Sequence, residues 1–295
     1  MRITNNIMAN TVMNNLFKTQ ERLAKFQEIV SSQKLINRPS DDPIGMGKIL
    51  EYRKRLSSIE QNFNNIIHGK TWIDMTETTL GTIDELLNIV KNTAVEQSGG
   101  DLDSRQIAAQ DVKIAYDQIM ELANTKLGGS HIFAGHQTDA VPFTRDANYN
   151  ATYAGDDGDV RIIISDSMTA KINVTGQDAF VAGTNLFDVL RDLIIALEDP
   201  NYDPAAVEAQ LQPLTDAAKQ IELVRAEGAT NYSRLDITEN QLARLKTDLE
   251  DMLYETENAD MVEAILNLQL EETAYQTSLE TAARIIQPTL IDFLR

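Results

Sequence analysis

The sequence contains no cysteine among its 295 residues. Neither disulfide bonds nor thiolate chemistry can therefore contribute to its fold or function, and a metal ion could be bound only by histidine and carboxylate side chains. The absence also suits a chain that passes into an oxidising exterior, because no mispaired disulfide can form there.

Long apolar runs are missing too. The first seven residues hold no continuous apolar stretch, and the most apolar later segment, 186–197, is interrupted by Asp188, Arg191 and Asp192. We therefore expect neither a cleavable signal peptide nor a membrane-spanning helix. If the protein leaves the cell, it must use a route that reads no such signal.

Basic residues are scarce relative to acidic ones. Lysine and arginine number 26 against 45 aspartate and glutamate residues, which gives a formal net charge of -19. Such a surface repels phosphate backbones, so we expect no nucleic-acid partner.

Patterns of catalysis or metal binding are also lacking. Of the three histidines, His68, His131 and His136, the last two are five residues apart, which is no helix-face spacing for a metal. Residues 156–159 read Asp-Asp-Gly-Asp but lack the alternate ligands and closing glutamate of a calcium loop. No nucleophile elbow or phosphate-binding glycine loop is present. We predict no catalytic residue, no cofactor and no metal site; an enzyme remains an alternative that a reproducibly bound metal or substrate would favour.

What the sequence does contain is an amphipathic helix at each end. Steps of four and three residues relate Val12, Leu16, Leu23, Phe26 and Val30, with Thr19 in the one polar position. The same steps relate Met261, Ile265, Leu268, Glu272, Tyr275, Leu279, Ala282 and Ile286. This is a heptad pattern, and the two stripes can bury each other as a coiled coil. The residues we assign to an assembly interface on these helices are Val12, Leu16, Leu23, Phe26, Val30, Ile265, Leu268, Tyr275, Leu279 and Ile286.

The pattern between these ends predicts further helices around a small β-rich segment. Asp42 can cap a helix that has Pro43 at its first position, and Asp260 can cap the last one, while Pro288 should kink it near its end. We predict a mainly α fold: an elongated rod of long helices, with paired terminal helices and a β-rich insert projecting outward. The expected domains are a terminal coiled coil (1–42 and 256–295), a helical rod (43–135 and 184–255) and the insert (136–183).

Several segments of the sequence resemble one known family. Residues 32–45, Ser-Gln-Lys-Leu-Ile-Asn-Arg-Pro-Ser-Asp-Asp-Pro-Ile-Gly, are similar to the segment after the first helix in the flagellin and hook-associated protein family. The opening residues 1–4 with Asn10, and residues 260–264 through 291–295, resemble its two ends. Residues 128–135, Gly-Gly-Ser-His-Ile-Phe-Ala-Gly, resemble hook-associated members more than true flagellins.

The resemblance implies a structural subunit of the bacterial flagellum at the hook–filament junction, outside the cell. It implies synthesis in the cytoplasm and export through the flagellar type III apparatus. The implied partners are hook-associated protein 1, flagellin, further copies of the chain in a junction ring and an export chaperone, with no membrane insertion. The alternatives are a flagellin filament subunit, a helical signalling protein of the coiled-coil type, and an ordinary helical bundle whose stripes are all internal.

Overall fold

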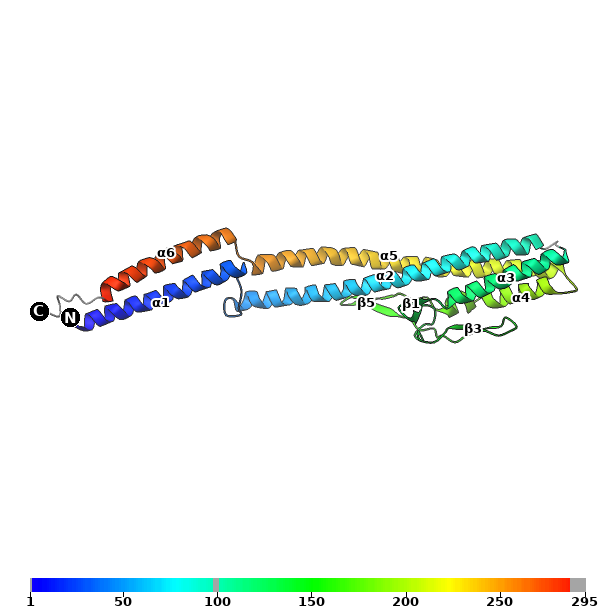
Figure 1. The fold of residues 1–295 in the computed structure, drawn as a ribbon, viewed down its shortest axis with the longest axis horizontal. Helices are drawn as coiled ribbons and strands as arrows, with labels where there is room; N and C mark the ends of the chain where they lie inside the picture. Colours follow the sequence, from blue (N-terminus) through cyan, green and yellow to red (C-terminus); the bar gives the residue numbers. More distant parts are fainter. Residues whose placement is uncertain (1, 98–100, 287–295) are drawn as a thin grey trace. The chain divides into compact units, whose positions relative to one another are not determined.

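The computed structural model describes residues 2–97 and 101–286. The chain is mainly helical, as predicted, and Figure 1 shows the order of its elements. The α-helices are α1 (Arg2–Ser32), α2 (Pro43–Gln97), α3 (Leu102–Ala123), α4 (Leu186–Glu198), α5 (Pro204–Glu257) and α6 (Met261–Ile286). The strands are β1 (Lys126–Leu127), β2 (Ser130–His131), β3 (Phe143–Arg145), β4 (Ala151–Tyr153), β5 (Arg161–Ser165) and β6 (Met168–Lys171), and a π-helix, η1, spans Gln177–Val181.

The contacts divide the chain into two compact units. Unit 1 comprises residues 1–58 and 244–295, and unit 2 comprises residues 59–243. This grouping cuts across α2 and α5, so it differs from the three domains expected from the sequence, and that division stays a prediction. In unit 1, α1 and α6 lie side by side and antiparallel (Figure 1). The predicted pairing of the terminal helices is therefore confirmed.

Side-chain caps start two of these helices where the sequence predicts. The Asp42 carboxylate accepts the amide N–H of Ile44 at 3.0 Å, and α2 begins at Pro43. The Asp260 carboxylate accepts the amide N–H groups of the second and third residues of α6 at 2.9 and 3.2 Å. Each cap satisfies a donor that has no partner within the helix. The predicted kink at Pro288 lies outside the described residues.

In unit 2, α2 and α5 are joined by ion pairs and covered by α3 and α4. Lys70 on α2 contacts Asp236 on α5 at 2.7 Å, and Arg225 on α5 contacts Glu77 on α2 at 2.6 Å. Helix α2 continues unbroken through Gly69. A Cβ there would lie 2.6 Å from the side chain of a residue in β5, so glycine permits the hairpin to approach.

The strands form three separate two-stranded antiparallel ladders. Thr144 pairs with Thr152 in the β3–β4 ladder, and Ile162 pairs with Ala170 in the β5–β6 ladder. Both ladders lie within the β-rich segment predicted at 136–183. The third ladder, β1–β2, precedes that segment and was not predicted from the sequence.

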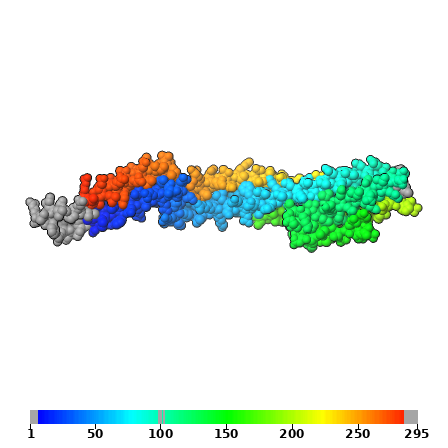
Figure 2. Space-filling view, viewed as in Figure 1, coloured from blue at the N-terminus to red at the C-terminus, as the bar shows by residue number. Residues whose placement is uncertain are grey.

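The β-rich segment is part of the core of unit 2, so its expected outward projection is wrong. Phe143 and Phe180 are fully buried, and their rings lie 5.1 and 6.1 Å from the ring of Phe187 on α4. Figure 2 shows the residues of α3 and of this segment (green) as one continuous mass beside α2 (cyan). Large aromatic side chains explain the difference. Each one buries a large apolar surface, and the alternation of residues in short strands does not reveal this.

Candidate functional site

Helix α1 presents its predicted stripe to α6. Thr19 is buried, and the five apolar residues predicted around it are all half-buried: Val12, Leu16, Leu23, Phe26 and Val30. Since α6 is the helix that α1 packs against, these side chains line the contact between them. We call the residues of α1 and α6 that face each other the terminal seam.

Helix α6 is rotated relative to the prediction. Leu268 and Tyr275 are half-buried as expected, but Ile265 and Leu279 are 44% and 42% exposed. The side chain of Ile286 lies outside the described residues. The inward positions follow steps of three and four residues: Ala264, Leu268, Glu271, Tyr275, Ser278 and Ala282. Ile265 and Leu279 thus lie outside the terminal seam, and their place in an assembly interface stays a prediction.

A polar layer interrupts the terminal seam. Arg22 Nε donates to Glu271 Oε1 at 2.9 Å, and Arg22 Nη2 lies 3.3 Å from the hydroxyl of Thr19. The hydrogen bond that Arg22 donates to Glu271, followed by the negative charge of Glu271, raises the pKa of the Arg22 guanidinium. The second carboxylate oxygen of Glu271 has no partner within the described residues. One polar layer in an apolar seam costs stability and fixes the register of the two helices.

The sequence pattern had placed Glu272, not Glu271, in the stripe. The two glutamates are adjacent, and the apolar residues of α6 occupy more than one face, so heptad spacing alone could not choose between them. The signal that distinguishes them is Arg22, which lies three residues after Thr19 on α1 and needs an acidic partner across the seam.

A groove of about 570 Å³ runs along the α1–α6 pair. Its lining consists of Val12, Asn15, Leu270, Thr273, Ala274, Thr277, Ser278 and Thr281. The hydroxyls of Thr273 and Thr277 donate to backbone carbonyl groups four residues earlier in α6, at 2.9 Å. With their hydroxyls engaged in this way, these threonines add apolar surface to the groove.

Large apolar side chains lie exposed on both helices of the pair. Val262, Leu266 and Leu270 are spaced four residues apart on α6 and are 57% exposed or more. On α1, Ile7 and Phe17 are about as exposed. A helix with apolar residues on its outer face is stabilised when another helix covers them. The terminal helix pair therefore carries apolar surface that its own two helices do not cover.

The two connectors of unit 1 meet at Glu257. The carbonyl group of Glu257 accepts the amide N–H of Leu35 at 2.8 Å, and the amide N–H of Ala259 donates to Gln33 at 3.1 Å. The buried Glu257 carboxylate binds Arg53 Nη2 at 2.6 Å and also the Lys34 ammonium. No local pattern in the sequence indicated this contact, because its members are separated by about two hundred residues.

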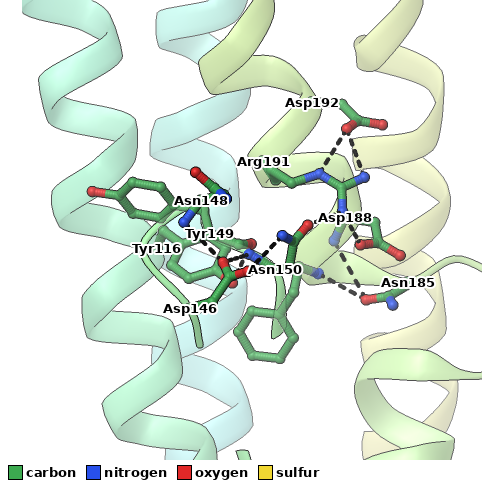
Figure 3. Close-up of polar contacts among 10 residues, drawn as sticks. Tyr116, Asp146, Asn148, Tyr149, Asn150, Asn185, Asp188, Arg191 and Asp192 are labelled. Carbon is green, nitrogen blue, oxygen red and sulfur yellow. Dashed lines mark hydrogen bonds and ion pairs between the residues drawn. The ribbon is translucent and has the colours of Figure 1, made fainter. Parts of the chain in front are cut away.

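A second polar cluster lies in unit 2 (Figure 3). The Asp146 carboxylate accepts the amide N–H groups of Asn148 and Asn150 at 2.8 and 2.9 Å. Hydrogen bonds from Asn150, side chain first, lower the pKa of Asp146. Tyr149 between them has φ 60°, and its carbonyl group accepts the buried Tyr116 hydroxyl at 2.9 Å. The cluster fixes the β3–β4 loop on α3.

Arg191 on α4 completes this cluster. Its guanidinium donates to Asn150 Oδ1 at 2.9 Å and forms ion pairs at 2.8 Å with Asp188 and Asp192. The same helix begins at Asn185, whose side chain accepts the amide N–H of Phe187 at 3.1 Å. Since these polar groups bind one another, the cluster explains how the loop is held.

The histidines and the Asp156–Asp159 loop are also engaged in local structure. Buried His131 has Nδ1 2.8 Å from the carbonyl oxygen of Asn124, and the amide N–H of exposed His136 donates to Asp156 at 2.6 Å. That bond and one from Gly158 lower the pKa of Asp156. Across residues 2–97 and 101–286, no three His, Asp or Glu side chains gather as a metal site would require.

Gly135 ends the glycine-containing motif of residues 128–135. Its φ is +66°, and a Cβ there would lie 2.1 Å from an oxygen of Asp156. Only glycine fits this conformation and this approach. The motif is thus a tight structural loop.

In the described part of the chain, no helix is both long and apolar enough to span a membrane.

Comparison with known proteins adds the family context. Residues 3–138 match the bacterial flagellin N-terminal helical region. Over 94% of its length the chain is 24% identical to the flagellar hook-associated protein 3 of Escherichia coli strain K12, covering 95% of that protein. It is 25% identical to the protein of the same name from Salmonella typhimurium strain LT2, over 95% of this chain and 96% of that one.

A solved structure shows the same fold. A Vibrio parahaemolyticus protein described as a flagellar hook-associated protein superposes with a TM-score of 0.69 at 23% identity, covering 74% of this chain and all of that one.

The paired terminal helices and the helical unit 2 with its β ladders form a fold similar to that of a flagellar hook-associated protein. The comparisons confirm the resemblance to the flagellin and hook-associated protein family. Relatives that match along nearly the whole of both chains include these two hook-associated proteins 3 and, at 20% identity, the flagellar filament 33 kDa core protein of Treponema phagedenis.

Proposed function

We propose that this chain is a structural subunit at the hook–filament junction of a bacterial flagellum. The observation that carries the proposal is the similarity to two hook-associated proteins 3 along nearly the whole of both chains. The structure supports it physically, because the terminal helix pair exposes apolar side chains and carries a groove of about 570 Å³.

Assembly follows from covering this apolar surface. Full burial of one large apolar side chain contributes about 1.5 to 3 kcal/mol, so three such residues on α6 can bind a neighbouring helix firmly. We infer that helices of adjacent subunits fill the groove and cover Val262, Leu266 and Leu270. The polar layer at Arg22 and Glu271 keeps α1 and α6 in register while they do so.

The partners proposed for this surface are hook-associated protein 1 on the hook side and flagellin on the filament side. Further copies of the chain complete a ring. Export unfolded through the flagellar type III apparatus, with a chaperone in the cytoplasm, fits the sequence in two ways. It has no cysteine that could mispair. Its long helices also consist of local contacts, which form quickly after threading.

A filament subunit is the second candidate, because the matched family region is that of flagellin itself. Immunogold labelling of intact flagella separates the two. A single band at the hook–filament boundary supports the junction role, whereas labelling along the filament supports flagellin. In a clean deletion strain, the junction role predicts hooks without filaments and flagellin in the medium; filaments of normal number and length would contradict it.

A further inference from the structure

The parts of α2 and α5 that belong to unit 1 carry opposite net charges. Residues 43–58 of α2 contain four basic residues and one acidic residue, a net charge of +3. Residues 244–257 of α5 contain two basic residues and five acidic ones, a net charge of -3. In a chain of net charge -19, a basic segment of this size is a local reversal of sign. The electric fields of these two oppositely charged segments can orient a charged partner as it approaches.

Several of these charges have partners already. Arg53 binds Glu257 at 2.6 Å, and Arg55 binds Glu51 at 2.7 Å. They hold unit 1 together or pair along one helix, so they are not free to bind another molecule.

The remaining charges are exposed. Within the described residues, no ion pair engages Lys48, Lys54, Asp248, Asp251 or Glu255. The three acidic residues follow steps of three and four along α5 and therefore share one helix face.

Lys54 and Asp248 each have an exposed apolar neighbour one helical turn away. Leu50 is 59% exposed and lies one helical turn before Lys54 on α2. Met252 is 48% exposed and lies one turn after Asp248 on α5. Apolar residues flanked by charges are typical of protein interfaces, where the charges form the rim. We call Leu50 and Lys54 the basic α2 face, and Asp248, Asp251, Met252 and Glu255 the acidic α5 face.

We propose that the basic α2 face of one copy binds the acidic α5 face of the next copy. The inference rests on the proposed function, since it specifies how copies meet in the junction ring. A symmetric contact between two α2 faces would bring like charges together. A contact between the α2 face of one copy and the α5 face of the next joins opposite charges, and in the junction ring that we propose it can repeat from copy to copy until the ring closes. Exposed ion pairs contribute little affinity, so this contact sets the direction of assembly while the terminal helices supply the strength.

The absence of cysteine permits a direct test. One full-length variant carries Lys54→Cys and another carries Asp251→Cys, so neither can form a disulfide within one chain. The two are expressed together, and separately, in cells that build flagella, and isolated hook–filament junctions are oxidised. We expect a disulfide-linked dimer from the mixture, at a yield at least tenfold above that of either variant alone. Asp111→Cys, exposed on α3 in unit 2, replaces Asp251→Cys as the control and should give no dimer.

Charge exchange tests the same contact without demanding a disulfide geometry. Lys54→Glu alone and Asp251→Lys alone should each reduce incorporation at least fivefold, and both changes in one chain should restore it to within twofold. Additive losses in the double variant would overturn the inference. Equal dimer from a single-cysteine variant, or a product with a different protein, would overturn it as well.

Immunogold labelling of the same preparations tests the junction role separately from the contact between copies. A normal junction band without mixed dimer or charge rescue contradicts the contact between the two faces alone. Label along the filament contradicts the junction role and this inference with it.

Discussion

Arg53 Nη2 lies 2.6 Å from Glu257 Oε1, although the two residues are 204 positions apart in the sequence. Only 7% of the Glu257 side chain is exposed. Burial by itself would raise the pKa of the Glu257 carboxyl, but hydrogen bonds from Lys34 and Arg53 outweigh it, and the pKa falls below its ordinary value of 4.5. The carboxylate is therefore held charged where both connectors of unit 1 meet.

The first prediction is that Glu257→Gln destabilises unit 1 by about 1 to 2 kcal/mol at neutral pH. A buried ion pair that loses one partner usually costs about 3 to 5 kcal/mol, but both cations here are roughly half exposed and can be rehydrated. Urea unfolding followed by circular dichroism measures the change. Glu51→Gln is the matched control, because that exposed pair with Arg55 should contribute under about 0.5 kcal/mol. Equal losses in both variants would contradict a special role for Glu257.

The second prediction concerns the pH dependence of the same contact. Because the pKa of Glu257 is lower in the folded chain than in the unfolded chain, its stabilisation is complete above the unfolded value near 4.5. It is lost as the pH falls through the folded pKa. The difference in unfolding free energy between the wild type and Glu257→Gln should thus shrink steadily below about pH 4.5. Unfolding curves at a series of acidic pH values measure it, and a constant difference down to pH 3 would refute the assignment.

The third prediction is that the β-rich segment cannot be weakened without loss of unit 2. Phe143 is fully buried and contacts Phe180, Phe187 and Tyr153 through ring centroids 4.8 to 5.6 Å away. Phe143→Ala should cost about 3 to 5 kcal/mol, the usual loss for a buried aromatic side chain. Thermal melting compares it with Ile163→Ala, whose side chain is largely exposed and should matter little. Similar melting of the two variants would show that the segment projects from the core.

The fourth prediction is an alkaline transition linked to Tyr153. Its hydroxyl donates to carbonyl groups of Phe133 and Asp156 at 3.0 and 3.1 Å, and burial raises its pKa from 10 to about 12. Since the folded pKa is the higher one, this stabilisation is complete below about pH 10 and lost as the pH rises toward 12. Tyr153→Phe should remove that part of the alkaline dependence. Ultraviolet titration of the phenol in both proteins measures it, and an unchanged titration curve in the variant would contradict the assignment.

Sequence periodicity predicted the helices well because the residues that determine a helix and its ends lie close together in the sequence. The start of α2 depends on Asp42 and Pro43, which are adjacent, and the cap of α6 depends on Asp260 in the same way. The stripe of α1 was found for the same reason, since steps of four and three residues place its members on one face of the helix. On α6 the apolar residues surround more than one face, and only the partner Arg22 reveals that Glu271 points inward.

The parts that escaped prediction depend on contacts distant in sequence. Glu257 gains its role from Lys34 and Arg53, which no spacing rule connects to it. The burial of Phe143 depends on Phe187, which lies 44 residues later on α4, so short strands alone indicated a projecting insert. These contacts join residues that are far apart in the sequence. Sequence periodicity reports only on neighbouring residues, so it could not predict them.

The last prediction separates the terminal seam from the surface that we propose for assembly. Leu23 is half-buried against α6, whereas Leu279 is 42% exposed and lies outside the seam. Leu23→Asp places a charge between the paired helices, so it should destabilise the monomer by about 1 to 3 kcal/mol and also block incorporation.

Leu279→Asp should leave monomer melting within about 0.5 kcal/mol of the wild type, because its charge stays hydrated there. In the assembly a neighbouring helix would cover that charge, so incorporation at the junction should still fall at least tenfold. Leu223→Asp, at a leucine that is 72% exposed on α5 in unit 2, serves as the control for a charge at an exposed leucine. Circular dichroism of the monomers and quantitative blotting of isolated flagella give both readouts. Normal incorporation of Leu279→Asp would remove that flank of α6 from the proposed interface, and an unchanged monomer with Leu23→Asp would show that the seam contributes no stability before assembly.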